Sequence, residues 1–207
     1  MYIPPAFHET DREKIITVIR AARLANLVTA TQEGPFITPP PLFFDETEGE
    51  NGTLYGHVAR ANAQWRHAPL GEAIAVFMGP DAYVTPSWYE TKRETGKVVP
   101  TWNYVTVHAH GPIEFFDDAR RLLDTVTRLT RHHESPRATP WEVSDAPDDY
   151  IAAQLRGIIG LRLPVTRLEG KVKMSQNQSE ADRRGVAEGL AASDHAGERE
   201  ASRLIPR

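Results

Sequence analysis

The sequence contains no cysteine among its 207 residues. This absence excludes disulfide bridges, cysteine nucleophiles and thiolate metal sites, and it fits a reducing compartment. Long hydrophobic runs are absent too, and the first residues show no charged region followed by an apolar one, as an export signal would. We therefore expect a cytoplasmic protein that does not enter a membrane.

An excess of positive charge is also missing. Lys and Arg total 24 against 28 Asp and Glu, so the formal net charge is −4. Proteins that bind duplex DNA normally neutralise phosphates with clustered basic side chains. A local exception is the group Lys171, Lys173, Arg183 and Arg184. We interpret this group as a solvated face, with direct DNA contact as the less favoured alternative.

The glycine-rich signatures of nucleotide binding are absent as well. Neither a Rossmann fingerprint nor a Walker-type phosphate loop occurs, so a nucleotide would have to be held in another way. His108 and His110 alternate along a predicted strand, which is a workable spacing for two metal ligands. Because no third ligand is apparent nearby in the sequence, we predict no metal site and interpret the pair as hydrogen-bonded structural groups.

The residues that are present predict an α+β fold. The composition, 40% hydrophobic and 25% charged, is typical of a globular chain with one sizeable core. Periodicity and turn signals predict strands over 24–31, 36–44, 53–59, 73–79, 102–116 and 158–174, and helices over 11–23, 118–133, 148–156 and 179–192. Helices do not alternate with strands as in a βαβ sheet, so this pattern favours a barrel with helices packed beside it.

Three segments depart from regular structure. Pro39, Pro40 and Pro41 cannot donate hydrogen bonds to a sheet, so this stretch should lie at an edge or interrupt the pairing. Residues 87–100 are polar and include Gly96, which predicts a long, mobile hairpin or flap. Residues from Asp194 on hold few large apolar groups and are expected to fray or to dock on a partner chain.

Two features could serve a phosphorylated, planar ligand. The block GHVARANAQW, from Gly56 to Trp65, places a strand end, Arg60 and a helix start close together, as phosphate sites do. Simple capping of a helix explains the same residues. Aromatic residues gather in the middle third of the chain: Tyr83, Trp88, Tyr89, Trp102 and Tyr104. They are suited to stacking on a ring system and equally to filling a core.

The chain resembles the PaiB family in several ordered blocks along most of its length. These blocks are MYIPPAF, GHVARANAQW, FMGPDAYVTPSWY, VVPTWNYVTVHAHG, LRGIIGLRLPVTRLEGKVKMSQN and DRRGVAEGL. The resemblance implies a flavoprotein with the FMN-binding split barrel, a six-stranded antiparallel barrel with flanking helices. It implies a homodimer with flavin at the subunit interface and a role as a negative transcriptional regulator. Residues 1–174 would form the barrel domain, and residues 175–207 a helical tail packed on the barrel or on the partner subunit.

The resemblance also implies the cofactor-binding residues. The FMN phosphate would lie near His57, Arg60, Asn62 and Trp65 and would be met by Lys173, Gln176 and Asn177 from the last strand. The flavin ring would lie near Trp102 and Asn103. The sequence departs from the family pattern where relatives tend to show Thr-His-Leu-Pro, because it has Thr38-Pro39-Pro40-Pro41.

Three hypotheses follow for the function, and no catalytic residue can be chosen for any of them. The favoured one is a non-enzymatic FMN-binding regulator that acts on DNA or through another regulatory protein. The second is an FMN-dependent oxidoreductase of the pyridoxamine-phosphate-oxidase-like superfamily, in which the flavin carries the redox chemistry. The third is a barrel that has lost its flavin, which the proline run at residues 39–41 would explain.

Overall fold

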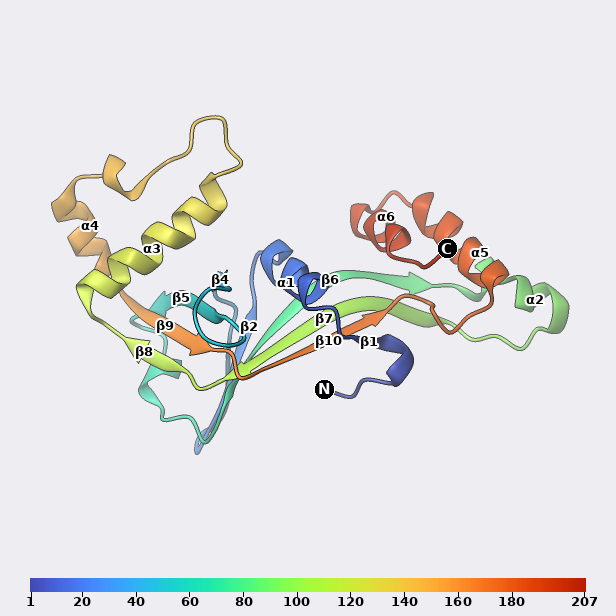
Figure 1. Cartoon of the computed structure of the whole chain (residues 1–207), viewed down its shortest axis with the longest axis horizontal. Coiled ribbons are helices and arrows are strands. Elements are labelled where there is room, and N and C mark those ends of the chain that lie inside the picture. The colour runs from blue at the N-terminus through green and yellow to red at the C-terminus, as the bar shows by residue number, and fades with distance from the viewer. The chain divides into compact units, whose positions relative to one another are not determined.

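The computed structural model describes all 207 residues, and the chain forms two compact units. Unit 1 consists of Met1–Ala21, Met78–Val107 and Glu169–Arg207, and unit 2 of Ala22–Phe77 and His108–Leu168. Figure 1 traces the chain through these segments. None of its helices is both long and apolar enough to cross a bilayer.

The chain contains ten strands and six α-helices. The strands are β1 (His8–Glu9), β2 (Asn26–Thr31), β3 (Gly34–Thr38), β4 (Leu42–Asp45), β5 (Thr53–Ala59), β6 (Ala73–Val84), β7 (Thr101–Gly111), β8 (Glu114–Phe116), β9 (Ile158–Pro164) and β10 (Arg167–Lys173). The helices are α1 (Arg12–Ala21), α2 (Glu90–Thr95), α3 (Ala119–Glu134), α4 (Asp148–Leu155), α5 (Glu180–Ala191) and α6 (Ala196–Arg203). Four short 3₁₀ helices, η1 (Pro5–Phe7), η2 (Gln64–Arg66), η3 (Pro86–Trp88) and η4 (Val143–Asp145), lie between them.

The strands form two sheets, a six-stranded one in the order β1-β10-β7-β6-β2-β3 and a four-stranded one in the order β4-β5-β9-β8. The pairs β1–β10, β2–β3 and β2–β6 of the first sheet are antiparallel. In the second sheet, β5 and β9 pair over their full lengths, from Thr53 opposite Pro164 to Ala59 opposite Ile158. The predicted α+β fold with a six-stranded antiparallel sheet is confirmed.

The core of unit 1 lies between its strands and the C-terminal helices. Helix α5 contributes Val186 and Leu190, which are four positions apart and therefore share one helical face. They pack with Val84 of β6, Val105 of β7 and Met174, which directly follows β10. The residues after Asp194 do not fray as expected: they form α6, and Ala201 and Ile205 are buried in the same cluster. Thus the 175–207 segment packs on strands of its own chain.

The core of unit 2 lies under α3, which packs on β4, β5 and β9. Asp118 caps this helix by accepting a hydrogen bond from the backbone nitrogen of Arg121. Leu122 then packs with Phe116 of β8 and Leu155 of α4. Gly160 of β9 leaves room for Phe116, since a Cβ atom there would lie 2.3 Å from its ring.

The proline run interrupts pairing, as predicted. It divides the expected strand over 36–44 into β3 and β4, which belong to different sheets, and β3 is an edge strand. The long strand expected over 158–174 is likewise two strands, β9 and β10, which also lie in different sheets. In both cases the chain leaves one sheet for the other within a few residues.

The segment between β6 and β7 is not the hairpin expected from its polar composition. It folds into η3 and α2, which pack against α5. The carboxylate of Asp182 on α5 accepts hydrogen bonds from the backbone nitrogen of Thr91 at 3.0 Å and from its hydroxyl at 2.7 Å. Two glycines of α5 let Trp88 approach closely: an added Cβ would lie 2.0 Å from the Trp88 carbonyl oxygen at Gly185 and 2.3 Å from the Trp88 ring at Gly189.

Replacement of Gly185 by alanine should therefore lower the free energy of unfolding. The new methyl group overlaps main-chain atoms that cannot turn away, and overpacking of this kind costs about 2 kcal/mol. Urea unfolding of the variant measures this loss. The matched control is Gly197→Ala in α6, where nothing lies within 4 Å, and which should stabilise the protein by up to about 1 kcal/mol. Equal stability of Gly185→Ala and the wild type would contradict the observed packing.

The contact between Asp182 and Thr91 should make unfolding depend on pH. Burial raises the pKa of the Asp182 carboxyl, but hydrogen bonds from Thr91 and Ser179 lower it by more, so the net pKa lies below the ordinary value of 3.8. A depressed pKa stabilises the fold above the unfolded-state value, and this contribution is lost as the pH falls through the folded-state value.

The variant Asp182→Asn should therefore cost about 2 kcal/mol near neutral pH, the typical value of a hydrogen bond to a charged group. Because the wild type loses the same contribution in acid, the difference between the two proteins should narrow as the pH drops below about 4. Unfolding free energies measured across this range test the expectation. A difference that stays constant with pH would show that the Asp182 charge is not involved.

Candidate functional site

The first part of the candidate site is an aromatic surface in unit 1. Side chains alternate between the two faces of a strand, so Trp102 and Tyr104 of β7 share one face and Asn103 points to the other. Trp102 is 54% exposed and Asn103 only 1%. The ring of Tyr83 on β6 meets Trp102 edge-on, with ring centroids 5.7 Å apart. A large aromatic pair is thus left open on this face.

Two lysines of β10 lie beside these aromatic side chains. The ammonium group of Lys173 donates hydrogen bonds to the hydroxyl of Thr101 and to the carbonyl oxygen of Trp102, both at 2.5 Å. The ammonium group of Lys171 lies 4.9 Å from the centre of the Tyr104 ring. We call Tyr83, Trp102, Tyr104, Lys171 and Lys173 the aromatic–lysine face.

The charges of this face are only partly compensated. Burial, and after it the charge of Lys171, lower the pKa of the Lys173 ammonium group. Lys171 is 8% exposed, and its ammonium group also donates to the carbonyl oxygen of Tyr2 at 3.3 Å. In these interactions Lys173 contacts two neutral oxygens, and Lys171 contacts one neutral oxygen and an aromatic ring. An anion placed here would offset the unfavourable burial of positive charge.

The second part of the site is the turn after β10. Gln176 braces this turn: its side chain accepts a hydrogen bond from the backbone nitrogen of Met174 at 2.6 Å and donates one to the carbonyl oxygen of Val172 at 2.5 Å. The buried amide of Asn103 contacts the hydroxyl of Ser175. Asn177 is exposed. Of the two predicted phosphate contacts in this turn, Gln176 is engaged in holding the turn together. The exposed side chain of Asn177 has no such role and faces solvent.

A separate group of predicted site residues lies in unit 2, at the end of β5. The guanidinium group of Arg60 donates to the carbonyl oxygens of Arg156 at 2.7 Å and Ile158 at 3.3 Å, and its third nitrogen lies 3.5 Å from the carboxylate of Asp117. The indole nitrogen of Trp65 donates to the Arg60 carbonyl oxygen at 3.0 Å. Arg60 is thus held in place by main-chain contacts, while 38% of its side chain remains exposed.

His57 and Asn62 complete this group. Asn62 uses both ends of its amide, donating to the hydroxyl of Thr38 at 2.9 Å and accepting from the backbone nitrogen of Gln64 at 2.8 Å, so it fixes the start of η2. His57 has a buried ring nitrogen, Nδ1, without a partner, and burial lowers the pKa of its imidazole. A neutral His57 with a free nitrogen can accept or donate one further hydrogen bond.

The structure therefore gathers the predicted site residues into two groups. His57, Arg60, Asn62 and Trp65 belong to unit 2, and Trp102, Asn103, Lys173, Gln176 and Asn177 belong to unit 1. Their roles in cofactor binding stay predictions. Sequence reasoning named Tyr83 among the aromatic residues suited to stacking on a ring, but it did not nominate Lys171 or Ser175 for the site. Lys171 alternates with Lys173 and could have been found by that spacing, whereas the conformation of Ser175 has no signal in the sequence.

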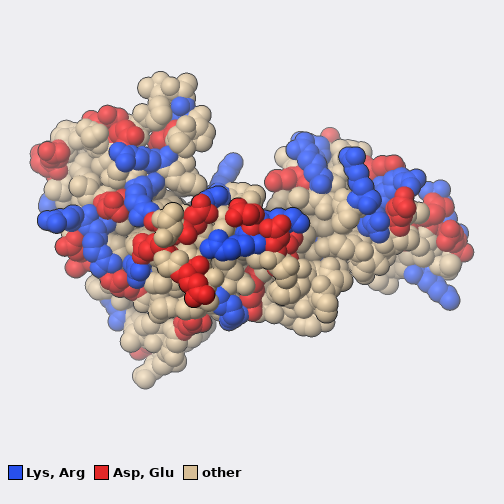
Figure 2. Space-filling model, in the orientation of Figure 1, with Lys and Arg blue, Asp and Glu red and all other residues tan.

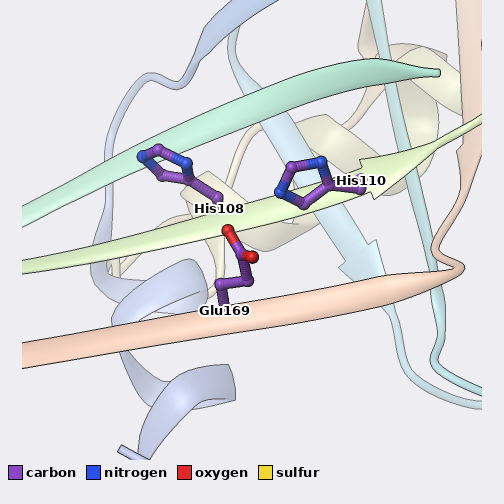
Figure 3. A group of neighbouring side chains, drawn as sticks. All are labelled: His108, His110 and Glu169. Carbon is purple, nitrogen blue, oxygen red and sulfur yellow. The ribbon is translucent and has the colours of Figure 1, made fainter. Parts of the chain in front are cut away.

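The two histidines of β7 project from its strand as the alternation predicts (Figure 3). Their ring centroids are 6.2 Å apart, and Nδ1 of His110 lies 3.1 Å from the guanidinium group of Arg167. Glu169 of β10, which Figure 3 also draws, belongs to unit 1 and accepts a hydrogen bond from the Met1 ammonium group at 2.7 Å.

The basic residues considered for DNA contact do not act as one group. Lys171 and Lys173 belong to the aromatic–lysine face. On α5, Arg183 donates to the carbonyl oxygens of Gln178 and Pro206, and Arg184 pairs with Glu180. Figure 2 shows Lys and Arg interspersed with Asp and Glu over the face that it draws. This arrangement fits a solvated surface better than a phosphate-binding one.

The fold is that of a split-barrel protein of the FMN-binding type. The sequence profile of the family described as "Putative FMN-binding domain" matches residues 1–167, and the chain belongs to this family. The protein named protease synthase and sporulation protein PAI 2 of Bacillus subtilis is 30% identical over 206 residues, which cover 99% of this chain and 96% of that protein. The resemblance to the PaiB family is thereby confirmed.

Two further comparisons extend this result. An uncharacterized protein of Aspergillus fumigatus is 41% identical over 172 residues, which cover 67% of this chain and 66% of that protein. The solved structure of the FAD and heme binding protein of Mycobacterium smegmatis shares the fold with a TM-score of 0.56 and 16% identity, over 80% of this chain and 73% of that one. Family membership supports a flavin cofactor.

The residues present fit such a cofactor. Exposed indole and phenol rings can stack on the planar isoalloxazine ring, and Tyr83 and Trp102 offer both. A phosphate requires cations and hydrogen-bond donors, which Lys173 provides in unit 1 and Arg60 in unit 2. The donor set therefore matches a flavin nucleotide in chemistry.

Proposed function

We propose that this protein binds FMN and works as a homodimeric, flavin-dependent regulator of the PaiB type. The aromatic–lysine face is the observation that carries the proposal. Trp102 is 54% exposed in spite of its size, and a cation is fixed directly against its main chain. Flavin mononucleotide combines a planar ring with a dianionic phosphate, so this face offers a partner for each half.

The flavin ring lies on the Tyr83–Trp102 pair in this proposal. Aromatic stacking adds about 1 kcal/mol beyond the burial of apolar area. Asn103 does not take part through its side chain, because it points into the core of unit 1. Lys173 and Asn177 hold the phosphate, and the Arg60 group of unit 2 is a second source of phosphate contacts. A phosphate next to Lys173 raises the pKa of the ammonium group again and so strengthens its own binding.

A second copy of the chain covers the exposed apolar surface in this proposal. Unit 1 exposes Met78 by 50%, Tyr83 by 43%, Val99 by 75% and Trp102 by 54%. The rings of Tyr83 and Trp102 are in contact, and exposed apolar side chains that lie next to one another mark interaction surfaces in soluble proteins. The homodimer of the PaiB type places flavin between its subunits, which would bury these side chains and the cofactor ring together.

The FMN site can be tested by titrating the purified protein with FMN and following the quenching of flavin fluorescence. The wild type should quench it, and Trp102→Ala, Lys173→Ala and Arg60→Ala should each weaken binding by about tenfold, which is 1.4 kcal/mol. The matched controls change residues that are not among the predicted site residues: Trp141→Ala, at 44% exposure, and the exposed Lys97→Ala. They should bind FMN like the wild type.

If the protein is colourless and does not quench FMN fluorescence, the proposal of an FMN cofactor is wrong. The hypothesis of a barrel that has lost its flavin is then favoured. Sedimentation of the same samples reports the oligomeric state. The protein should sediment as a dimer at micromolar concentration, and a monomer under these conditions would remove the shared interface from the proposal.

Regulation through another protein is favoured over direct DNA contact. The B. subtilis relative is named for protease synthase and sporulation, which fits a regulatory role for this chain. Direct repression would need a basic surface, yet Arg184 is paired with Glu180 and Lys171 is buried.

A mobility-shift assay at moderate salt should therefore show only non-specific binding to DNA. The double variant Arg183→Ala and Arg184→Ala removes two positive charges, so it should weaken that non-specific binding modestly and equally for every DNA sequence. Sequence-specific binding that the double variant abolishes would establish direct repression instead.

A further inference from the structure

Ser175 adopts an unusual backbone conformation in the turn after β10. Its φ angle is +62°, and it is the one non-glycine residue of the chain with a positive φ. Side chains with a Cβ atom avoid this left-handed region, and such residues persist only where their surroundings hold them in place. Ser175 is 4% exposed, so the conformation belongs to the packed interior and not to a loose surface loop.

Two side chains hold Ser175 in this conformation. The amide of Asn103, at 1% exposure, donates to the Ser175 hydroxyl at 3.0 Å, and its oxygen lies 3.2 Å from the same hydroxyl. The amide of Gln176 bridges Met174 and Val172, and the backbone nitrogen of Gln178 donates to the Ser175 carbonyl oxygen at 3.0 Å. All of these hydrogen bonds act on the shape of the turn.

The position of this turn connects it to the candidate site. Lys173 precedes it by two residues, and Asn177, with its exposed side chain, lies within it. Asn103 is the immediate neighbour of Trp102 on β7 but points to the opposite face. On one face of β7, Trp102 is available to stack on a flavin ring. On the other face, Asn103 supports the turn after β10.

We propose that Asn103, Ser175 and Gln176 are positioning residues that fix this turn for the phosphate of the flavin nucleotide, and that they set the preference for FMN over riboflavin. The proposal rests on the proposed FMN function and deepens it. None of the three side chains touches the ligand. They hold the main chain between Lys173 and Asn177 in the one conformation that meets the phosphate, so the ring is bound without their help.

The test compares the dissociation constants of FMN and riboflavin for each variant, because the two flavins differ only in the phosphate. Ser175→Ala and Asn103→Ala should weaken FMN binding by about tenfold and leave riboflavin binding within twofold of the wild type. Ser202→Ala is the matched control: it removes a hydroxyl that bonds Ala187 elsewhere in unit 1, and its ratio of FMN to riboflavin affinity should equal that of the wild type.

Gln176→Ala keeps the test decisive if the two buried variants fail to fold, since Gln176 is only half-buried and the Asn103–Ser175 contact remains. The Gln176→Ala variant should lower the ratio of FMN affinity to riboflavin affinity. An unchanged ratio in the folded variants, or equal weakening of both flavins, overturns this inference alone. A wild-type protein that binds neither flavin overturns the proposed function and this inference with it.

Discussion

The alternation of side chains along β7 is the constraint on which the candidate site depends. Successive residues of a strand face opposite sides, so Trp102 cannot leave its exposed position without moving Asn103 out of the interior. The strand therefore links the solvent-facing surface to the core of unit 1. Val105, two positions after Asn103, packs in that core beside Met174 and fixes the strand in its register. The packing of Asn103 and Val105 on the inner face of β7 therefore keeps the Trp102 ring exposed on the outer face.

Positive charge that is only partly compensated is the second property of this surface. Buried lysines usually have an anionic partner, because removal of an ammonium group from water is unfavourable. Lys171 and Lys173 instead contact carbonyl and hydroxyl oxygens and aromatic rings, which compensate the charge only in part. By contrast, Arg162 in unit 2 has the carboxylate of Glu48 at 2.6 Å. Arg162 is therefore neutralised by an ion pair, whereas Lys171 and Lys173 keep positive charge available beside exposed aromatic rings.

Much of the fold could be predicted from local sequence signals. Strand β5 begins and ends as expected because a glycine-containing polar loop precedes it and the Arg60 turn follows. The prolines at 39–41 revealed the break between sheets, since proline cannot donate a hydrogen bond. Helices α2 and α6 were missed for a common reason. Both are short and polar, and they are stabilised by distant contacts, Thr91 with Asp182 and Ala201 with the core of unit 1.

The candidate site was less predictable than the fold. The residues drawn from the family resemblance fall into coherent groups, yet their individual roles depend on side-chain direction, which a sequence shows only within regular strands. Asn62 and Gln176 were expected to contact phosphate, and the structure shows that both brace turns through paired hydrogen bonds. Ser175 could not have been found, because a left-handed serine leaves no trace in composition or spacing.

The close approach of Trp88 to α5 has a consequence for engineering. Because main-chain atoms of the segment between β6 and β7 occupy the space above Gly185, the shape of that segment is matched to one particular helix. A loop taken from a relative would fit only if the helix beneath it were grafted along with it. The segment at 85–100 and helix α5, although about 90 positions apart in the chain, form one exchangeable module.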